Sequence, residues 1–161
     1  MKLAVIYHSE TGNTKKAAEF VRAGMEKVEG VEARAFSIDA VDEAFVSEAG
    51  GVIFGAPTYY AFASWQMVQF LQTTKLPLAD KLGAAFSTAN FEQGGSEIVL
   101  ENINDMLLAK GLLVFSGGVS HGMPMTHLGA NAFAAGTSIE ARQSVLEALG
   151  EKFAKKAVQL F

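Results

Sequence analysis

Short apolar runs alternate along the chain with longer segments in which hydrophobic residues recur every three or four positions. The short apolar runs predict strands, and the three- and four-residue recurrence predicts amphipathic helices. The predicted strands cover residues 2–7, 31–38, 51–55, 82–87 and 112–115. The predicted helices cover residues 13–29, 42–48, 63–74, 95–110 and 138–160. Strands and helices therefore alternate over the whole length of the chain.

This alternation predicts an α/β fold. The apolar runs suit a parallel sheet that is covered on both faces, and every connection is long enough for the crossover that parallel strands need. No internal repeat, low-complexity tract or proline-rich linker divides the chain. We therefore expect one domain over residues 1–161, built as a three-layer, doubly wound sandwich around a five-stranded parallel sheet. Ligands of such folds bind beyond the carboxyl ends of the strands.

The composition excludes several classes of chemistry. The 161 residues include no cysteine, which excludes a disulfide scaffold, zinc or iron–sulfur ligation by cysteine and a cysteine nucleophile. Half of the residues are hydrophobic and 19% are charged, so the chain is not of the disordered class. A formal net charge of −4 predicts no basic surface for nucleic acid.

No segment predicts export or membrane insertion. The apolar run near the amino terminus ends at His8 and is too short for a signal peptide. Residues 49–74 and 111–139 lack Lys, Arg, Asp and Glu, but Gly, Pro, Ser and Thr interrupt both stretches. Neither stretch therefore predicts a membrane span, and we expect a cytoplasmic protein.

The loop after the first predicted strand has the composition of a phosphate-binding site. It runs directly into a helix and consists of Ser9, Glu10, Thr11, Gly12, Asn13 and Thr14. The first N–H groups of a helix have no intrahelical partner and lie at the positive end of its dipole, so this loop suits a phosphate without any basic side chain. An ordinary N-cap with Ser/Thr turn chemistry is the alternative. The chain has neither a Walker A ending nor a Gly-x-Gly-x-x-Gly motif.

The pattern Ser9-x-Thr11-Gly12-x-Thr14 after a first strand resembles the FMN-phosphate loop of flavodoxins. The chain length, the number of strands and the later loops agree with this family. The resemblance implies a flavodoxin-like sheet with strand order 2-1-3-4-5 and FMN bound noncovalently at its edge. It also implies that the protein transfers electrons, because the flavin carries the chemistry and the protein positions it.

The loop after the third predicted strand, residues 55–62, is rich in aromatic side chains. In flavodoxins the matching segment lies against the isoalloxazine ring of the flavin. The residues that the resemblance assigns to this contact are Pro57, Thr58, Tyr59, Tyr60 and Ala61. Their aromatic rings offer flat faces for stacking. Alternatively, Tyr59, Tyr60 and Phe62 are ordinary core side chains at the start of a helix.

In flavodoxins the loop after the fourth strand forms hydrogen bonds with the pyrimidine edge of the flavin. The residues that the resemblance assigns to this role are Ser87, Thr88, Ala89, Asn90, Phe91, Gly94 and Gly95. The Ser-Thr opening and the Gly-Gly-x-Glu ending of residues 87–97 are also similar to the NAD(P)H:quinone reductases related to the Trp-repressor-binding protein.

Three functions therefore stay open. The first is an FMN electron carrier that exchanges electrons with a redox protein or a reductase. The second is an NAD(P)H:quinone oxidoreductase, and the third is a flavodoxin-like binding module without flavin. The flavodoxin-type first loop, the small size and the lack of a recognisable nicotinamide motif favour the carrier.

Two further patterns predict little chemistry. Residues 118–122 match the Gly-x-Ser-x-Gly nucleophile elbow, but Met123-Pro124-Met125 follows instead of a helix. A triad also needs an acidic residue between the serine and the histidine in chain order, and none lies between Ser120 and His127. The three histidines have no metal-ligand spacing, so we expect no metal site. For the reductase alternative, His127 is a candidate proton donor to a reduced quinone.

Residues 116–138 form the longest segment without a predicted element. Loops longer than about 12–15 residues are usually functional or disordered, and this one holds no Asp, Glu, Lys or Arg but several large apolar side chains. Burial against a second subunit or a substrate is one interpretation, and packing over the sheet edge is the other. Residues 111–139 are therefore a candidate surface for a homo-oligomer.

Overall fold

The computed structural model describes residues 1–136 and 138–161; Thr137, within the candidate oligomer surface, lies outside the described residues. The strands are β1 (Lys2–Tyr7), β2 (Glu32–Ser37), β3 (Gly51–Tyr59), β4 (Phe62–Ala63), β5 (Leu82–Ala89), β6 (Leu113–Val114) and β7 (Ala130–Phe133). The helices are α1 (Asn13–Met25), α2 (Glu43–Glu48), α3 (Trp65–Thr73), α4 (Ser96–Ala109) and α5 (Gln143–Leu160), with short 3₁₀ segments η1 (Val119–His121) and η2 (Ile139–Arg142). In the described part of the chain, no helix combines the length and the apolar character that crossing a membrane needs.

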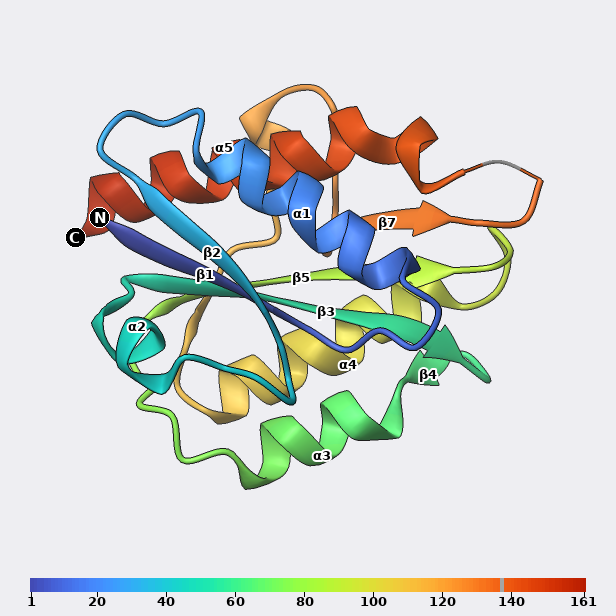
Figure 1. Cartoon of the computed structure of the whole chain (residues 1–161). Helices are drawn as coiled ribbons and strands as arrows, with labels where there is room; N and C mark the ends of the chain where they lie inside the picture. The colour runs from blue at the N-terminus through green and yellow to red at the C-terminus, as the bar shows by residue number, and fades with distance from the viewer. Residues whose placement is uncertain (137) are drawn as a thin grey trace.

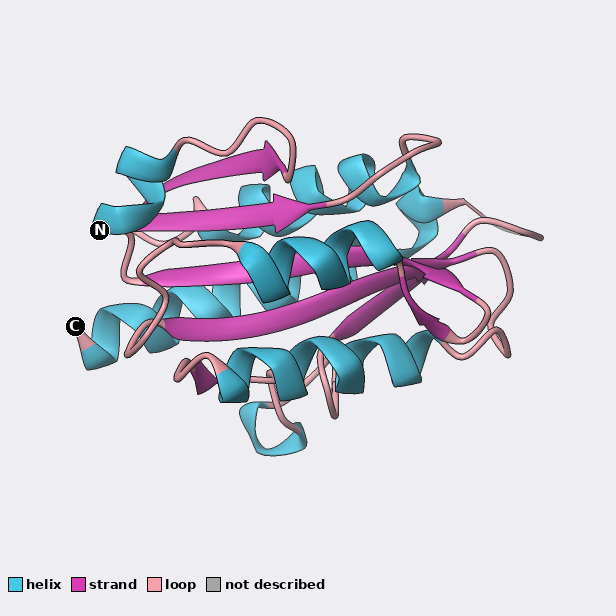
Figure 2. Cartoon of the chain, turned by 90° about the horizontal axis from the view of Figure 1, so that it is seen from below, coloured by secondary structure: helices cyan, strands magenta, loops and turns pink. Residues whose placement is uncertain are grey.

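The sheet has the order β2-β1-β3-β5, and both β6 and β7 pair with the outer side of β5. All of these pairs are parallel, whereas β4 pairs with β3 in the antiparallel direction. Figure 1 shows α1 and α5 on one face of the sheet and α3 and α4 on the other, and Figure 2 shows the long strands pointing the same way. The predicted doubly wound parallel sheet with strand order 2-1-3-4-5 is confirmed.

Two separate strands fill the fifth position of the sheet. In β6, Leu113 lies opposite Leu82 of β5, and in β7, Ala130 lies opposite Phe86. Each residue of β6 pairs with a β5 residue 31 positions earlier in the chain, whereas each residue of β7 pairs with one 44 positions earlier. The difference means that thirteen additional residues interrupt a single strand position. We call these residues, 116–128, the insertion. The prediction of an uninterrupted loop was wrong for β7. Ala and Asn have low strand propensity, and the pairing with β5 together with the burial of three of its four residues overrides that preference.

The other predicted elements are present, β1 with the predicted bounds and the rest with shifted ends. β3 and β5 continue past their predicted ends to Tyr59 and Ala89. α1 ends at Met25 rather than at residue 29, and the closing helix begins as the 3₁₀ segment η2 before α5 starts at Gln143. The short strand β4 was not predicted, because two residues carry too little pattern to be recognised.

Side chains of the central strands point alternately into two cores. In β1, Leu3 and Val5 belong to the core beneath α1 and α5, whereas Ala4 and Ile6 belong to the core beneath α2, α3 and α4. All four side chains are fully buried. This two-sided burial explains why the strands read as continuous apolar runs.

The helices α1 and α5 approach one another at two glycines, on the same face of the sheet (Figure 1). A Cβ atom on Gly24 would lie 2.0 Å from the carbonyl oxygen of Glu147, and one on Gly150 would lie 2.0 Å from the carbonyl oxygen of Val21. Backbone therefore packs against backbone, and no larger residue fits at either position without moving a helix.

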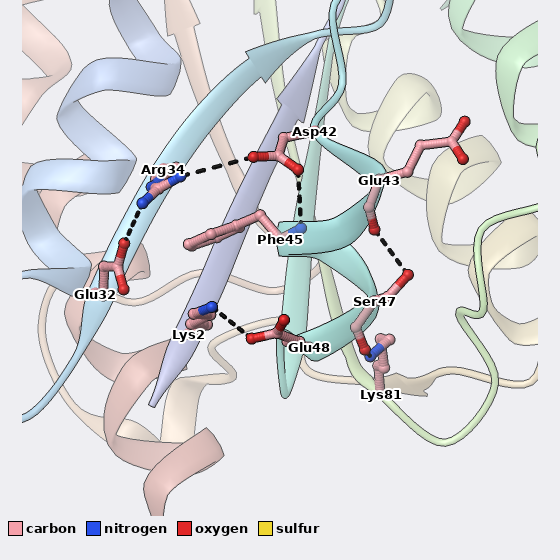
Figure 3. A network of polar contacts seen from close by, with 9 residues as sticks. All are labelled: Lys2, Glu32, Arg34, Asp42, Glu43, Phe45, Ser47, Glu48 and Lys81. Atoms are coloured by element: carbon pink, nitrogen blue, oxygen red, sulfur yellow. Dashed lines mark hydrogen bonds and ion pairs between the residues drawn. The ribbon is translucent and has the colours of Figure 1, made fainter.

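Charged side chains fix α2 near the amino-terminal ends of β1 and β2 (Figure 3). Asp42 caps the helix, because its Oδ1 accepts a hydrogen bond from the N–H of Phe45 at 3.0 Å. The guanidinium of Arg34 lies 4.5 Å from the centroid of the Phe45 ring, and Lys2 forms an ion pair with Glu48. This network stabilises the end of the sheet opposite the loops in which the sequence predicts the site.

Candidate functional site

The carboxyl ends of β1, β3 and β5 surround a cleft with a volume of about 290 Å³, which we call the strand-end cleft. All three loops that the sequence indicated contribute to it. The lining residues are Glu10, Thr11, Asn13, Thr14, Pro57, Thr58, Tyr59, Tyr60, Ala61, Thr88, Ala89, Asn90, Phe91 and Gly94. Of the predicted site residues, Ser9, Gly12, Ser87 and Gly95 lie outside this lining.

The first loop leads into a helix that no side chain caps. Gly12 has a φ of +92°, which glycine adopts without strain, and its N–H donates to Ser9 Oγ at 3.2 Å. The first turn of α1 holds no acidic residue, and the first hydrogen bond of the helix runs from the N–H of Lys16 to the carbonyl of Gly12. The N–H groups of residues 13–15 therefore have no intrahelical acceptor. Such a helix end can hold an anion by its backbone alone.

Two threonines join the first loop to the end of β5. Thr14 Oγ1 and Thr88 Oγ1 are 2.8 Å apart, and both residues are almost completely buried. Ser87, one residue earlier, is fully buried, and its hydroxyl donates to the carbonyl of Ser96 at 3.1 Å. Thr88 thus contributes its side chain to the cleft, whereas Ser87 supports the loop from behind.

Tyr60 and Ala61 form a two-residue hairpin between β3 and β4. Both have positive φ angles, +52° and +57°, which residues other than glycine adopt rarely. Strained backbone of this kind is concentrated at functional sites. Gly95 allows the hairpin to lie against the start of α4, because a Cβ atom on Gly95 would be 2.5 Å from the Cβ of Ala61.

Aromatic side chains border the cleft without being covered. Tyr60 is fully exposed, Phe91 is 67% exposed and Tyr59 is 37% exposed. Phe62, next to the hairpin, is also exposed. The interpretation of these rings as core side chains was therefore wrong. Flat apolar faces at the mouth of a cleft can cover a planar ligand.

Glu10 is the one carboxylate among the described residues that line the cleft, and no Lys or Arg lines it. Its Oε1 accepts a hydrogen bond from Gln66 Nε2 at 2.9 Å. The pKa of Tyr59 is raised, mainly by burial and also by the charge of Glu10 and a hydrogen bond to it. An anionic group of a ligand would therefore depend on backbone N–H groups and hydroxyls rather than on a cationic side chain.

His8, at the end of β1, is buried behind Glu10. Its Nδ1 lies 2.9 Å from Ser64 Oγ, and its Nε2 lies 4.0 Å from Glu10 Oε1. Burial lowers the pKa of His8, although the nearby carboxylates of Glu10 and Asp39 oppose this shift. The imidazole is therefore neutral at pH 7.

Ser64 and Gln66 were not predicted from the sequence. Each contacts a residue 56 positions earlier in the chain, and no local pattern indicates such a contact. Two buried oxygens at the cleft and its wall, Thr58 Oγ1 and Gln66 Oε1, have no hydrogen-bond partner among the described residues. Unpaired buried groups of this kind point to a missing ligand or water.

His127 lies away from the strand-end cleft. It lines a separate cavity of about 270 Å³ with Glu97, Asn131 and Arg142, and none of the residues lining this cavity also lines the strand-end cleft. Ser120 of the elbow-like motif is an exposed residue of η1, without the strand–turn–helix setting of a nucleophile.

Comparison with known proteins identifies relatives over the whole chain. A family model described as "Flavodoxin domain" matches residues 4–120. A flavodoxin from Clostridium saccharobutylicum is 42% identical over 165 residues, which covers 100% of this chain and 100% of that protein. An NAD(P)H dehydrogenase (quinone) from Geotalea daltonii is 30% identical over 145 residues, which covers 71% of this chain and 70% of that protein.

A solved structure described as a flavodoxin from the domain Archaea superposes with a TM-score of 0.78 at 25% identity, over 98% of this chain and 99% of that one. Both the carrier and the reductase interpretations of the sequence thus have counterparts among the similar proteins.

Proposed function

This chain belongs to the flavodoxin family, and we propose that its strand-end cleft holds FMN with the three loops described above, so that the protein works as an electron carrier. Flavodoxins bind FMN and transfer electrons through it; when bound, FMN supplies the redox chemistry, and the protein orients it and tunes its potential. The observation that carries the proposal is the meeting of an uncapped helix end, a hydroxyl pair and exposed aromatic rings at one cleft.

We assign the phosphate of FMN to the first loop. The N–H groups of residues 13–15 are without intrahelical acceptors, and the hydroxyls of Thr11 and Thr14 line the same part of the cleft. A phosphate dianion matches this donor set and the positive end of the helix dipole. The carboxylate of Glu10 adds one negative charge near this loop, which repels a phosphate. The affinity for the phosphate therefore depends on how many N–H and hydroxyl groups donate to it.

We assign the flavin ring to the space between the hairpin of residues 59–62 and the loop that carries Phe91. Tyr59 and Phe91 contribute the apolar faces that a planar ring would cover. Thr58 Oγ1 fits the cofactor, because this buried hydroxyl has no partner among the described residues and a polar edge of a ligand would satisfy it.

The quinone reductase is the second candidate function, and the relative named NAD(P)H dehydrogenase (quinone) favours it. A nicotinamide dinucleotide carries several negatively charged phosphate oxygens, which Lys or Arg side chains usually bind. No Lys or Arg is among the described residues that line the strand-end cleft, and His127 lies in a different cavity. We therefore favour the carrier. A binding module without flavin is the third candidate.

Titration of purified protein with FMN tests the cofactor assignment. We expect saturable binding at one site, quenching of flavin fluorescence and a changed visible spectrum. Protein that is colourless as isolated and gains no flavin absorbance on titration would leave only the module without flavin.

Stopped-flow mixing of the FMN-loaded protein with NADPH or NADH separates the carrier from the reductase. For a carrier, we expect no bleaching of the flavin until a partner reductase is added. Rapid bleaching followed by turnover of a quinone would show the reductase instead.

The partners of the carrier are proposed to be a redox protein and a reductase; NAD(P)H and a quinone belong to the alternative. The large exposed side chains of the insertion, such as Met123 and Met125, make residues 111–139 a candidate contact for a second copy of the chain. Light scattering at several protein concentrations measures this association. The cytoplasmic location stays a prediction.

A further inference from the structure

A second cleft lies beyond the Glu10–Gln66 hydrogen bond, and we call it the α3 cleft. It has a volume of about 450 Å³ and lies between the end of β1, the turn after β2 and one face of α3. Figure 1 shows α3 as the helix farthest from the sheet on its face. The residues that give the cleft its chemistry are His8, Asp39, Trp65 and Gln66.

Trp65 is a large apolar residue of α3 that the packing of the helix against the core leaves exposed. The neighbouring α3 residues Met67 and Leu71 are fully buried, whereas the side chain of Trp65 is 67% exposed at the edge of the cleft. Large exposed apolar side chains beside a cleft mark contact surfaces, and Trp contributes more to binding energy than most residues at protein interfaces.

The α3 cleft is negatively charged. Asp39 is exposed at its edge, Glu10 lies directly behind Gln66, and no Lys or Arg is found among the described residues that line it. Burial keeps His8 neutral at pH 7, so the imidazole does not offset these charges. The cleft thus favours a cation and opposes phosphate groups, which argues against a nicotinamide dinucleotide as its ligand.

The wall between the two clefts also carries an unsatisfied acceptor. Gln66 donates its Nε2 hydrogen to Glu10, and its Oε1 is buried without a partner among the described residues. The α3 cleft and its wall thus contain three acceptors that a donor group could satisfy: the Asp39 carboxylate, Gln66 Oε1 and, on the other side of the wall, the carboxylate of Glu10. A ligand that fits them is rich in hydrogen-bond donors.

We infer that the α3 cleft receives an arginine side chain of a redox partner protein, with the guanidinium group stacked on Trp65 and directed toward Asp39. A guanidinium group is planar, positively charged and has five donors, so it can stack on an indole and bond a carboxylate at the same time. The ammonium group of lysine lacks the flat face. Charge complementarity therefore selects a cation, and the flat face available for stacking on Trp65 selects arginine.

The position of the α3 cleft gives this contact a use in electron transfer, and here the inference rests on the proposed function. Gln66 lines the α3 cleft and donates to Glu10 of the strand-end cleft at 2.9 Å. An arginine held in the α3 cleft would therefore anchor its protein one side chain away from the proposed FMN site. Complementary charge at such a contact also speeds the encounter of the two proteins.

The single tryptophan of the chain makes a direct test possible. In ¹⁵N-labelled full-length protein loaded with FMN, only Trp65 gives an indole N–H resonance. We expect N-acetyl-arginine amide to shift this resonance saturably and N-acetyl-citrulline amide, which has the same shape without the charge, to leave it in place. Asp39→Asn is expected to weaken the binding of the arginine derivative at least fivefold.

Glu43→Gln is the matched control, because it removes one negative charge from an exposed position of α2 outside the cleft. It should bind the arginine derivative as tightly as the unmodified chain. Equal shifts with both derivatives, no shift with arginine, or an unchanged affinity in Asp39→Asn would overturn the inference. The same titration is repeated on protein without FMN, so that a failure of flavin binding is recognised separately from a failure of arginine binding.

Discussion

The first loop contains two kinds of threonine. Thr14 is 2% exposed and its hydroxyl is already shared with Thr88, whereas Thr11 is exposed at the cleft, and no hydrogen bond to another described residue holds its side chain. A change at Thr14 would therefore alter both the loop structure and ligand binding. A change at Thr11 isolates ligand binding.

Thr11→Ala should weaken FMN binding about ten- to a hundredfold, because a hydrogen bond to a charged group contributes about 1.5–3 kcal/mol. Riboflavin, which lacks the phosphate, should bind the variant nearly as well as the unmodified chain. Fluorescence titration with both ligands measures the difference. Equal losses for the two ligands would show that this loop does not hold the phosphate.

The lowered pKa of His8 predicts that the stability of the protein depends on pH. Burial lowers its pKa in the folded protein, so the unfolded chain takes up a proton at a higher pH than the folded chain does. The contribution of His8 is complete above the ordinary histidine pKa of about 6.5, and it is lost as the pH falls below that value. The free energy of unfolding should therefore decrease on going from pH 7 to pH 5.

Urea unfolding at several pH values measures this slope. His8→Asn keeps a polar atom near the position of Nδ1 beside Ser64 and should flatten the slope between pH 7 and pH 5. The exposed His121 provides the control, since His121→Asn should leave the slope between pH 7 and pH 5 unchanged. The hydrogen bond with Lys16 lowers the pKa of Glu140 to about 2. The contribution of Glu140 to stability is therefore lost only below about pH 4.5, outside the range from pH 7 to pH 5. An identical slope in His8→Asn and the unmodified chain would contradict the assignment.

Residue types in local order were enough to predict which loops form the strand-end cleft. The hydroxyls of the first loop and the aromatic residues of the second stand next to predicted strand ends, and the parallel sheet brings those ends together. The wall behind the cleft could not be predicted in this way. Its contacts from His8 to Ser64 and from Glu10 to Gln66 depend on how α3 packs, and that packing leaves no periodic signal in the sequence.

At the scale of elements, the packing of α1 against α5 depends on Gly24 and Gly150. Gly150→Ala would place a Cβ atom 2.0 Å from the carbonyl oxygen of Val21, so one helix must move. We expect a loss of at least about 1–3 kcal/mol in the free energy of unfolding, the usual cost of overpacking. Gly24→Ala should behave in the same way.

Gly50→Ala is the matched control for these variants. A Cβ atom there would meet its nearest neighbour, the ring of Phe161, at 3.6 Å, which is an ordinary contact. Its effect on chemical denaturation should stay within about 0.5 kcal/mol. If Gly150→Ala unfolded at the same denaturant concentration as Gly50→Ala, the close approach of the helices would not limit stability.

The strands were predicted unequally well, and the reason is physical. The bounds predicted for β1 agree with the structure, because its apolar run is continuous and both of its edges are paired. β7 is an edge strand, and it begins thirteen residues later in the chain than it would if it continued β6 without the insertion. Its register is determined by pairing with β5, a long-range interaction that no local window contains.

At the scale of the whole molecule, the register shows that the insertion is an addition to a complete sheet. Continued by one residue, the register of β6 places Phe115 opposite Ala84 of β5, and the N–H of Phe115 donates to the carbonyl of Gly83. The register of β7 places Gly129 opposite Ala85, which is the next residue of β5. The insertion is held to the body of the protein by Lys152, which donates to the carbonyls of Gly122 and Pro124, and by Asn104 of α4, which donates to the carbonyl of Leu128. None of these hydrogen bonds involves a residue of a strand.

Deleting residues 116–128 should therefore join β6 and β7 into one continuous strand beside β5. Because Thr88 and Ala89 pair with β7 and are the part of β5 that lines the strand-end cleft, FMN affinity reports directly on whether that pairing survives. We expect the dissociation constant for FMN to change by less than about threefold, which corresponds to about 0.7 kcal/mol. Flavin fluorescence titration of the shortened chain measures it, with amide hydrogen exchange in β7 as a second readout. A loss of FMN binding greater than tenfold, or rapid exchange throughout β7, would show that the insertion is needed to hold the edge strand and is not merely added to it.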